Sequence, residues 1–234
     1  MQRPESIENR WDILYSEYPE VYEAFMNVPY QPSVFDQVPE IIDLRGKIIA
    51  DVGAGTGRSS LALARTARQV IGIEYEPAML RQARQKAFGE EASRVLYLSG
   101  DALAIPLAND SVDIVTGFTL ALFPPERYRV FIREGLRVAK SKVVYVGIPP
   151  GWYGGDLDYV IENPYKGKID VEMDRIFIEE YQFAYKDVFS NQEYGTIENI
   201  ISIYGFIFGN KVIKHIKREN ITSIRWKYRV YWRE

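Results

Sequence analysis

The segment Ile48–Leu61 reads I-I-A-D-V-G-A-G-T-G-R-S-S-L and constrains the fold more than any other part of the chain. Four apolar residues and one acid lead into glycines at alternate positions, Gly53, Gly55 and Gly57. Glycine permits positive φ and lets the backbone approach a ligand without an intervening Cβ. The segment therefore predicts a buried parallel strand, a sharp turn and a helix start, the element that holds a nucleoside-like cofactor at the edge of an α/β sheet.

The spacing of the glycines separates two classes of cofactor. A dinucleotide fingerprint is G-x-G-x-x-G/A, whereas here the glycines fall as G-x-G-x-G and Arg58 stands where the third small residue would be. An acid, Asp51, lies two residues before the first glycine. Glu74 ends the next predicted strand, and Gly100-Asp101-Ala102 follows the third. Three signals at separate strand ends, in the right order, are more specific than the glycines alone.

With these residues the chain resembles a class I methyltransferase dependent on S-adenosylmethionine (SAM) over roughly residues 40–148. The resemblance implies an α/β fold, a doubly wound Rossmann-like sheet that is mostly parallel, with one or more antiparallel C-terminal strands and helices on both faces. It also implies SAM as cofactor and S-adenosylhomocysteine as product. Ile105-Pro106 and the stretch Asp110–Asp113 are similar to the ubiquinone/menaquinone-biosynthesis type of small-molecule methyltransferase.

Composition excludes several other classes of function. The 234 residues are 47 % hydrophobic and 26 % charged with a net charge of −3, which implies no obligatory partnership with nucleic acid or an anionic membrane. The absence of cysteine excludes disulfides and thiol catalysis, and with a single histidine we expect no metal site. The first six residues lack the apolar core of a signal peptide, and no apolar run approaches the roughly 18 residues of a membrane span. We expect a cytoplasmic protein that does not insert into membranes.

Apolar runs and helical spacing alternate through the first two thirds of the chain, which predicts right-handed crossovers and a parallel sheet. The predicted strands are 47–52, 70–74, 95–99, 112–117 and 142–147. The predicted helices are two short ones separated at Pro19, one near 38–44, and others over 59–67, from 77 to about 88, and from 125 onward. We expect an N-terminal helical lid over 1–40 and a SAM-binding domain over 41–234.

The last third is less regular. An irregular insertion is expected over about 148–180, rich in proline and glycine, followed by a strand over 181–189. A helix is expected over 196–208, with apolar spacing that continues past Gly209 to about Asn220; the alternative is a strand over 211–216. From Ile224 to Trp232 every second residue is apolar, which predicts a half-exposed strand.

The resemblance assigns roles to residues at the strand ends. Glu74 would accept hydrogen bonds from the ribose hydroxyls, Tyr75 would pack on the adenine, Asp101 would accept from the adenine amino group and Ala102 would offer its backbone N–H. Asp51 would orient the methionine amino group, or fix the glycine loop through backbone N–H groups. Asp101 is also explained as a helix N-cap and Tyr75 as a surface residue. The complete set of predicted cofactor-binding residues is Asp51, Gly53, Ala54, Gly55, Gly57, Glu74, Tyr75, Asp101, Ala102 and Phe118.

Phe118 belongs to the rim after the fourth strand, which in the family faces both SAM and acceptor. Enzymes that methylate amino groups of nucleic acid or glutamine often carry Asn/Asp-Pro-Pro-aromatic there, and Phe118-Thr119 disfavours that subclass. Methyl transfer is an in-line displacement that needs a base only when the acceptor is protonated, so no catalytic residue is assigned. Candidates near the mouth, each equally explained by packing, are Tyr15, Tyr30, Thr119, Trp152, Tyr153 and Asp156.

We therefore expect a SAM-dependent methyltransferase with an unidentified, small-molecule acceptor, acting as a monomer or homodimer. The alternatives are an RNA or protein methyltransferase and a non-catalytic SAM-binding regulator or scaffold, because the cofactor site would look the same. A nucleotide-binding oxidoreductase is disfavoured by Arg58. The single histidine, His215, is expected at the surface. A basic cluster is interpreted as a solvated face, with an RNA or acidic partner as the alternative; it comprises Lys211, Lys214, Lys217, Arg218, Arg225, Lys227, Arg229 and Arg233.

Overall fold

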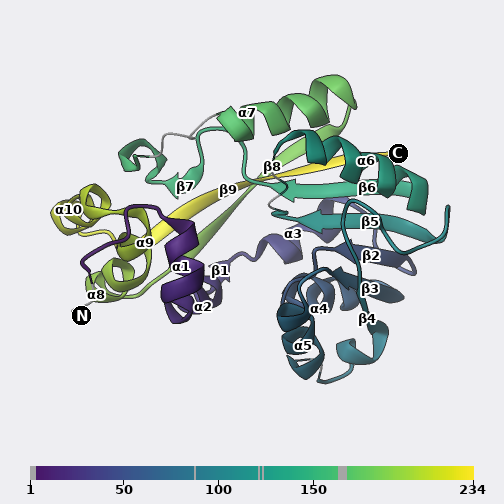
Figure 1. Ribbon diagram of the computed structural model, residues 1–234, viewed down its shortest axis with the longest axis horizontal. Coiled ribbons are helices and arrows are strands. Elements are labelled where there is room, and N and C mark those ends of the chain that lie inside the picture. The colour runs from purple at the N-terminus through teal and green to yellow at the C-terminus, as the bar shows by residue number, and fades with distance from the viewer. Residues whose placement is uncertain (1–3, 87, 121, 123, 163–167) are drawn as a thin grey trace. The chain divides into compact units, whose positions relative to one another are not determined.

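The computed structural model describes residues 4–86, 88–120, 122, 124–162 and 168–234 (Figure 1). The chain divides into two compact units. The first, called here the helical unit, comprises Met1–Val34, Pro149–Asp170 and Phe189–Tyr228. The second, the sheet unit, comprises Phe35–Ile148, Val171–Val188 and Arg229–Glu234. Each unit is described by itself below.

Five parallel strands form the centre of the sheet unit. They are β2 (Ile48–Val52), β3 (Gln69–Glu74), β4 (Val95–Ser99), β5 (Val112–Phe118) and β6 (Ala139–Gly147). Their order is β6-β5-β2-β3-β4, and β9 (Ser223–Arg233) pairs antiparallel with β6, from Val143 opposite Arg233 to Gly147 opposite Arg229. The chain leaves β2 toward β3 and β4, then returns to place β5 on the other side of β2. This reversal is the topological switch point at which open α/β sheets bind ligands. The predicted fold class is confirmed.

The helices of the sheet unit follow the predicted crossovers. They are α4 (Arg58–Ala64), α5 (Pro77–Lys86), α6 (Glu126–Val138) and α3, which spans Val34–Ile41 and so begins before the predicted 38–44. The π-helical turn Ile176–Glu180 continues α7 (Lys168–Arg175). Fully buried side chains from α6, β6 and the π turn form the core, with the Tyr145 and Phe177 rings stacked at 4.7 Å between centroids. Gly135 of α6 lets that helix approach Val143 closely, since a Cβ there would lie 3.1 Å from the valine.

The last strand departs from the predicted alternation at its end. Ile224, Trp226, Tyr228 and Val230 are buried as expected, but Tyr231, predicted on the exposed side, is also fully buried. Its ring packs against Phe177 at 4.9 Å and its hydroxyl donates to Asp174 Oδ1 at 2.7 Å. Within the sheet unit both faces of this strand end are therefore covered, which a period of two does not reveal.

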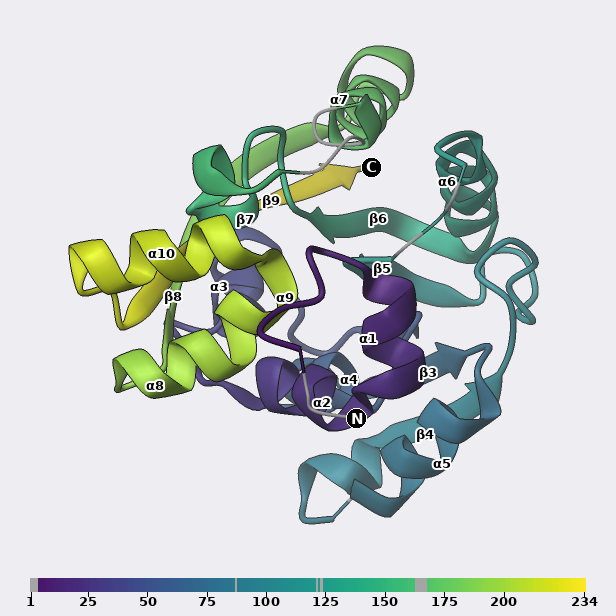
Figure 2. The ribbon, with the colours of Figure 1, turned by 60° about the vertical axis from the view of Figure 1, so that its left-hand side comes forward.

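The helical unit begins with α1 (Trp11–Glu17) and α2 (Pro19–Asn27), which confirms the break at Pro19. It contains the short strands β1 (Tyr30–Gln31) and β7 (Tyr153–Asp156) and the 3-10 turn η2 (Asp158–Val160). Strand β8 (Ala184–Glu193) runs past its predicted end, and its last residues pair with β1. The insertion expected to be irregular over about 148–180 therefore contains β7, η2 and, in its last part, α7 and the π turn that follows it. Figure 2 shows the helices of the helical unit from a second side.

The C-terminal helical segment is interrupted at Gly209. It consists of α8 (Ile197–Ile200), a π turn (Ile201–Gly205), α9 (Phe206–Phe208) and α10 (Asn210–Glu219). Gly209 has φ 113° and ψ 170°, and the Glu8 carboxylate lies where its Cβ would be. Glu8 Oε1 also accepts the Asn210 backbone N–H at 2.9 Å. The predicted continuous helix is therefore wrong at this residue, and the alternative strand over 211–216 is wrong as well.

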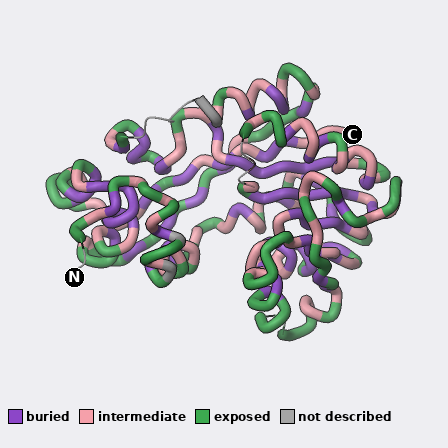
Figure 3. Tube along the Cα trace, in the orientation of Figure 1, coloured by how far each residue is buried: buried purple, intermediate pink, exposed green. Residues whose placement is uncertain are grey.

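Figure 3 shows how far each described residue is buried along the Cα trace. In the sheet unit, β2, β5 and β6 are buried for most of their length, as expected of central parallel strands covered on both faces. Among the described residues, no helix is both long enough and apolar enough to cross a membrane.

Candidate cofactor site

A cleft of about 350 Å³ opens at the carboxyl ends of the parallel strands in the sheet unit. It lies where ligands bind in doubly wound folds, and its volume falls in the range of small-molecule sites. Its lining comes from the segments after β2, β3, β4 and β5. The lining residues are Gly53, Glu74, Tyr75, Gly100, Asp101, Ala102, Phe118, Thr119, Leu120 and Leu122. The structure thus brings six of the ten predicted residues together; the other four, Asp51, Ala54, Gly55 and Gly57, are not among the lining residues.

The glycine loop requires its glycines for two different reasons. Gly53, Gly55 and Gly57 all have positive φ, between 55° and 86°. Gly55 has open space around it, so only its conformation demands glycine. At Gly53 a Cβ would collide with the Leu120 side chain, and at Gly57 it would collide with the Tyr97 hydroxyl. Gly57 therefore serves the packing of α4 on the sheet, while Gly53 faces the cleft.

Glu74 connects the loop to the end of β3. Its Oε2 accepts the Gly55 backbone N–H at 2.8 Å, and its Oε1 accepts the Glu76 backbone N–H at 2.8 Å. Each carboxylate oxygen has two acceptor positions, so each retains one that these bonds do not use. The side chain lines the cleft and is half-buried. The acid is thus fixed in direction and still able to bind two hydroxyl groups.

Asp51 lies behind the glycine loop and is fully buried. Its Oδ2 accepts from the Ser59 and Ser60 hydroxyls at 2.7 and 2.6 Å, and its Oδ1 accepts from Thr116 at 3.2 Å. Burial raises the pKa of Asp51 to about 6, although the three hydroxyl donors act in the opposite direction. Asp51 therefore ties the start of α4 to β2 and β5 through hydroxyl groups. The alternative interpretation from the sequence had Asp51 fix the loop through backbone N–H groups instead.

The third strand end supplies Asp101 and Ala102. Asp101 Oδ1 accepts the Leu103 backbone N–H at 2.9 Å within a turn, not at the start of a helix, so the N-cap interpretation is wrong. Tyr75 is 72 % exposed beside this turn in the cleft lining. Gly100 is required by packing, because a Cβ there would lie 2.6 Å from Pro106 and 2.8 Å from Ile73.

The rim after β5 holds the residues that sequence reasoning missed. Phe118 lines the cleft as expected and packs edge-on against Phe35 at 5.2 Å. Thr119 has φ 47°, unusual for a β-branched residue, and the turn directs Leu120 back over Gly53 and Gly117. The Leu120 carbonyl accepts from the Tyr128 hydroxyl at 2.7 Å. No sequence pattern marks Leu120; Ala121 and Phe123, which the rim prediction also covers, are outside the described residues.

The other candidates for the cleft mouth belong to the helical unit. Tyr153 donates to Asn9 Oδ1 at 2.9 Å, Trp152 packs on Phe189, and Asp156 Oδ1 accepts the Arg225 backbone N–H at 3.2 Å. The Tyr15 side chain is outside the described part of the chain. Their roles toward an acceptor stay predictions. Within the described residues, no cluster of His, Cys, Asp or Glu is arranged to hold a metal ion.

Comparison with known proteins relates part of the chain to methyltransferases. Residues 49–142 match the model of the methyltransferase domain family. An uncharacterised methyltransferase of Mycobacteroides abscessus is 36 % identical over 104 residues, 44 % of this chain and 40 % of that protein. A demethylmenaquinone methyltransferase of Lactococcus lactis is 27 % identical over 70 % of this chain and 68 % of its own length. The YcgJ protein of Bacillus subtilis, at 18 % identity, superimposes over 85 % of this chain and 95 % of its own with a TM-score of 0.57.

The fold is that of class I methyltransferases, with the doubly wound, mostly parallel sheet and the antiparallel C-terminal strand that the sequence predicted. The match to the methyltransferase domain family covers residues 49–142, less than half of the chain. The matched region covers less than half of the Mycobacteroides relative.

Proposed function

We propose that the cleft binds SAM and that the chain transfers its sulfonium methyl group to a small-molecule acceptor. The observation that carries this proposal is the position of Glu74. Its carboxylate lines the cleft and is held by the Gly55 and Glu76 backbone N–H groups, with one acceptor position free on each oxygen. A ribose diol needs two such acceptors side by side.

The neighbouring residues fit the remainder of the nucleoside. Asp101 uses Oδ1 within its own turn, and its Oδ2 is proposed to accept from the adenine amino group. Ala102 would offer its backbone N–H to a ring nitrogen. The exposed Tyr75 ring would cover one face of the adenine, since aromatic rings stack with offset geometry.

The methionine end of the cofactor is proposed to lie along the glycine loop. Gly53 has no side chain between its backbone and the cleft. Ala54, Gly55 and Gly57 would act through the shape of the loop. Asp51 is buried behind that loop, so we propose that it positions the loop without direct contact with the amino group.

When bound, SAM supplies a methyl carbon already activated by positive sulfur. The chain would then have to exclude water and hold the acceptor in line with that carbon. Phe118, Leu120 and Leu122 give the rim of the cleft an apolar wall suited to excluding water. A base is required only for an acceptor that is protonated in its ground state, and no residue is assigned to that role.

A small acceptor is supported by Phe118-Thr119 at the rim and by similarity to a protein named demethylmenaquinone methyltransferase. We further propose a monomeric or homodimeric cytoplasmic protein; the lid expected from the N-terminal helices and the 148–180 insertion stays a prediction. RNA or protein acceptors and non-catalytic SAM binding remain the alternatives.

Calorimetry and thermal melting with SAM, S-adenosylhomocysteine and NADH, each on the same preparation, test the proposal. A ligand at 100 times its Kd stabilises the folded state by about 2.7 kcal/mol. We expect SAM and S-adenosylhomocysteine to bind and NADH not to bind. Binding of NADH alone would overturn the cofactor. S-adenosylhomocysteine that copurifies with the protein would favour turnover over passive binding.

A further inference from the structure

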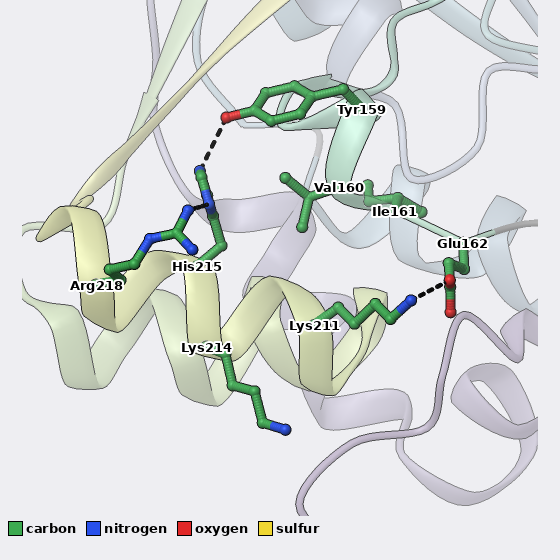
Figure 4. A pocket seen from close by; sticks show the side chains of 8 residues that line it. All are labelled: Tyr159, Val160, Ile161, Glu162, Lys211, Lys214, His215 and Arg218. Atoms are coloured by element: carbon green, nitrogen blue, oxygen red, sulfur yellow. Dashed lines mark hydrogen bonds and ion pairs between the residues drawn. The ribbon is translucent and has the colours of Figure 1, made fainter.

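The helical unit contains a second groove, lined by residues 159–162 at and after η2 and by the face of α10 opposite them (Figure 4). Its volume is about 480 Å³. The lining residues are Tyr159, Val160, Ile161, Glu162, Lys211, Lys214, His215 and Arg218. None of them belongs to the proposed cofactor cleft, and the proposed function gives them no role.

One end of the groove is a hydrogen-bonded chain of three side chains. Arg218 Nη2 lies 2.9 Å from His215 Nδ1, and His215 Nε2 lies 2.9 Å from the Tyr159 hydroxyl. Arginine has only donors, so Nδ1 must accept, and a neutral imidazole then carries its hydrogen on Nε2 and donates it to Tyr159. The hydroxyl hydrogen of Tyr159 is not used in this chain and is available to a ligand.

The two rings reinforce this end of the groove. Tyr159 and His215 pack edge to face, with 5.6 Å between centroids and planes at 88°. Tyr159 is nevertheless 72 % exposed, so most of its surface faces outward from the protein. A large aromatic ring that is positioned by a hydrogen bond and left exposed offers a platform for a planar or apolar group.

The lining carries three cations and one carboxylate. Lys211 pairs with Glu162 at the far end of the groove, while Val160 and Ile161 lie between that pair and the Tyr159–His215–Arg218 chain (Figure 4). Positions 211, 214, 215 and 218 share one side of α10 because they are three or four residues apart. Arg218 gives Nε to Glu219 at 2.7 Å and Nη2 to His215, which leaves Nη1 for another acceptor. The excess of positive charge favours an anion.

We propose that this groove is a binding site for a small organic anion. Its planar or apolar body would lie against Tyr159 and Val160, and its carboxylate or phosphate group would bind Arg218. Guanidinium suits both groups because its fork of donors matches two oxygens of a carboxylate or phosphate. Lys211 and Lys214 would add positive charge along the path of the anion.

Phenyl phosphate, benzoate and phenol are suitable probes, because they share a ring and differ in the anionic group. They would be titrated into the full chain without SAM, with binding followed by NMR and calorimetry at low salt. We expect phenyl phosphate or benzoate to saturate the site and phenol to bind at least about tenfold more weakly. Which of the two anions binds more tightly identifies the group that the site prefers.

Substitutions inside and outside the groove distinguish a binding site from a merely basic surface. Arg218→Gln is expected to weaken anion binding by about tenfold or more, and Tyr159→Ala by several-fold. Lys217→Gln removes the same charge from α10 but does not line the groove, so it should change the affinity less than twofold. Circular dichroism and melting temperatures establish that each variant is folded.

Two results would overturn the proposal. One is the absence of saturable binding of either anion to the folded wild-type chain. The other is an equal loss of affinity in Arg218→Gln and Lys217→Gln, which would mean that the whole basic face attracts anions; a single-stranded RNA probe would then bind with steep salt dependence. Because SAM is not present, neither result bears on the proposed methyl transfer.

Discussion

Gly55 donates its backbone N–H to Glu74 Oε2 at 2.8 Å, joining the glycine loop after β2 to the acid at the end of β3. The two residues belong to two separate motifs of the sequence, 19 positions apart. The bond gives Glu74 a structural role in the absence of any ligand, because it fixes the loop and the direction of the carboxylate together. A group that is already oriented loses less conformational freedom when a ligand binds.

Glu74→Ala is expected to weaken SAM binding by about 100-fold or more, because two charge-assisted hydrogen bonds to the ribose are lost. The fold should survive, since only the Gly55 and Glu76 N–H groups lose a partner in a half-exposed place. Calorimetric titration with SAM measures the affinity. Glu76→Gln is the control, since this exposed neighbour does not line the cleft. Unchanged affinity in Glu74→Ala would contradict the role assigned to this residue.

Gly53→Ala and Gly55→Ala form a matched pair on the glycine loop. Both glycines have positive φ, so each substitution carries a conformational cost of about 1 kcal/mol. Only at Gly53 does the added Cβ also meet Leu120, which adds the cost of overpacking, typically about 1–3 kcal/mol. Denaturant unfolding should therefore show the larger loss of stability in Gly53→Ala.

A double-mutant cycle isolates the contact between residue 53 and Leu120. Leu120→Ala removes the side chain that the new Cβ would meet, so Gly53→Ala should cost about 1 kcal/mol less in that background. Additive changes in the free energy of unfolding would mean that Leu120 does not pack over Gly53.

The strand ends of the candidate site could be predicted because their signals are local. An apolar run followed by glycine or an acid marks where a buried strand stops, and β3 and β4 end at Glu74 and Ser99 as predicted. Parallel strands then bring their carboxyl ends to one edge of the sheet. Glu74 and Asp101 meet at one cleft because of the topology of the sheet. This could therefore be predicted without knowing any individual side-chain contact.

The features that could not be predicted depend on residues distant in sequence. Leu120 reaches Gly53 only because Thr119 turns the chain back after β5. Apolar spacing continues unbroken through Gly209, and the break there reflects the approach of Glu8. Tyr231 lies on the side predicted to be exposed, yet Phe177 covers it. Each outcome is set by tertiary packing, which periodicity does not encode.

Thr119→Gly is expected to stabilise the protein by about 1 kcal/mol. Thr119 has φ 47°, a conformation that costs a β-branched residue about 1–2 kcal/mol and that glycine adopts freely. Part of this gain is offset because glycine has more freedom in the unfolded chain. The backbone N–H of Thr119 donates to the Val146 carbonyl at 2.7 Å, and glycine retains this hydrogen bond. Thr119→Ala keeps the positive φ with a smaller side chain and serves as the comparison. A loss of stability in Thr119→Gly would contradict the conclusion that the backbone of Thr119 is strained.

Asp51→Asn is expected to change how stability depends on pH. Burial raises the pKa of Asp51 from 3.8 to about 6, so the folded state binds a proton that the unfolded state has already released between these values. The contribution of this group to stability is fully present below about pH 4 and is lost as pH rises through about 6. The difference of about two pKa units corresponds to roughly 3 kcal/mol.

Denaturant unfolding of wild type and Asp51→Asn at several values between pH 4 and pH 7 measures this effect. The amide cannot ionise, so the variant should gain stability relative to wild type as pH rises, by roughly 3 kcal/mol across the range. Any cost of rearranging the bonds to Ser59 and Ser60 is independent of pH and shifts the whole curve. Asp110→Asn, at an exposed turn, controls for the loss of one negative charge. Parallel stability curves for wild type and Asp51→Asn would show that Asp51 titrates alike in the folded and unfolded states, against the effect of its burial.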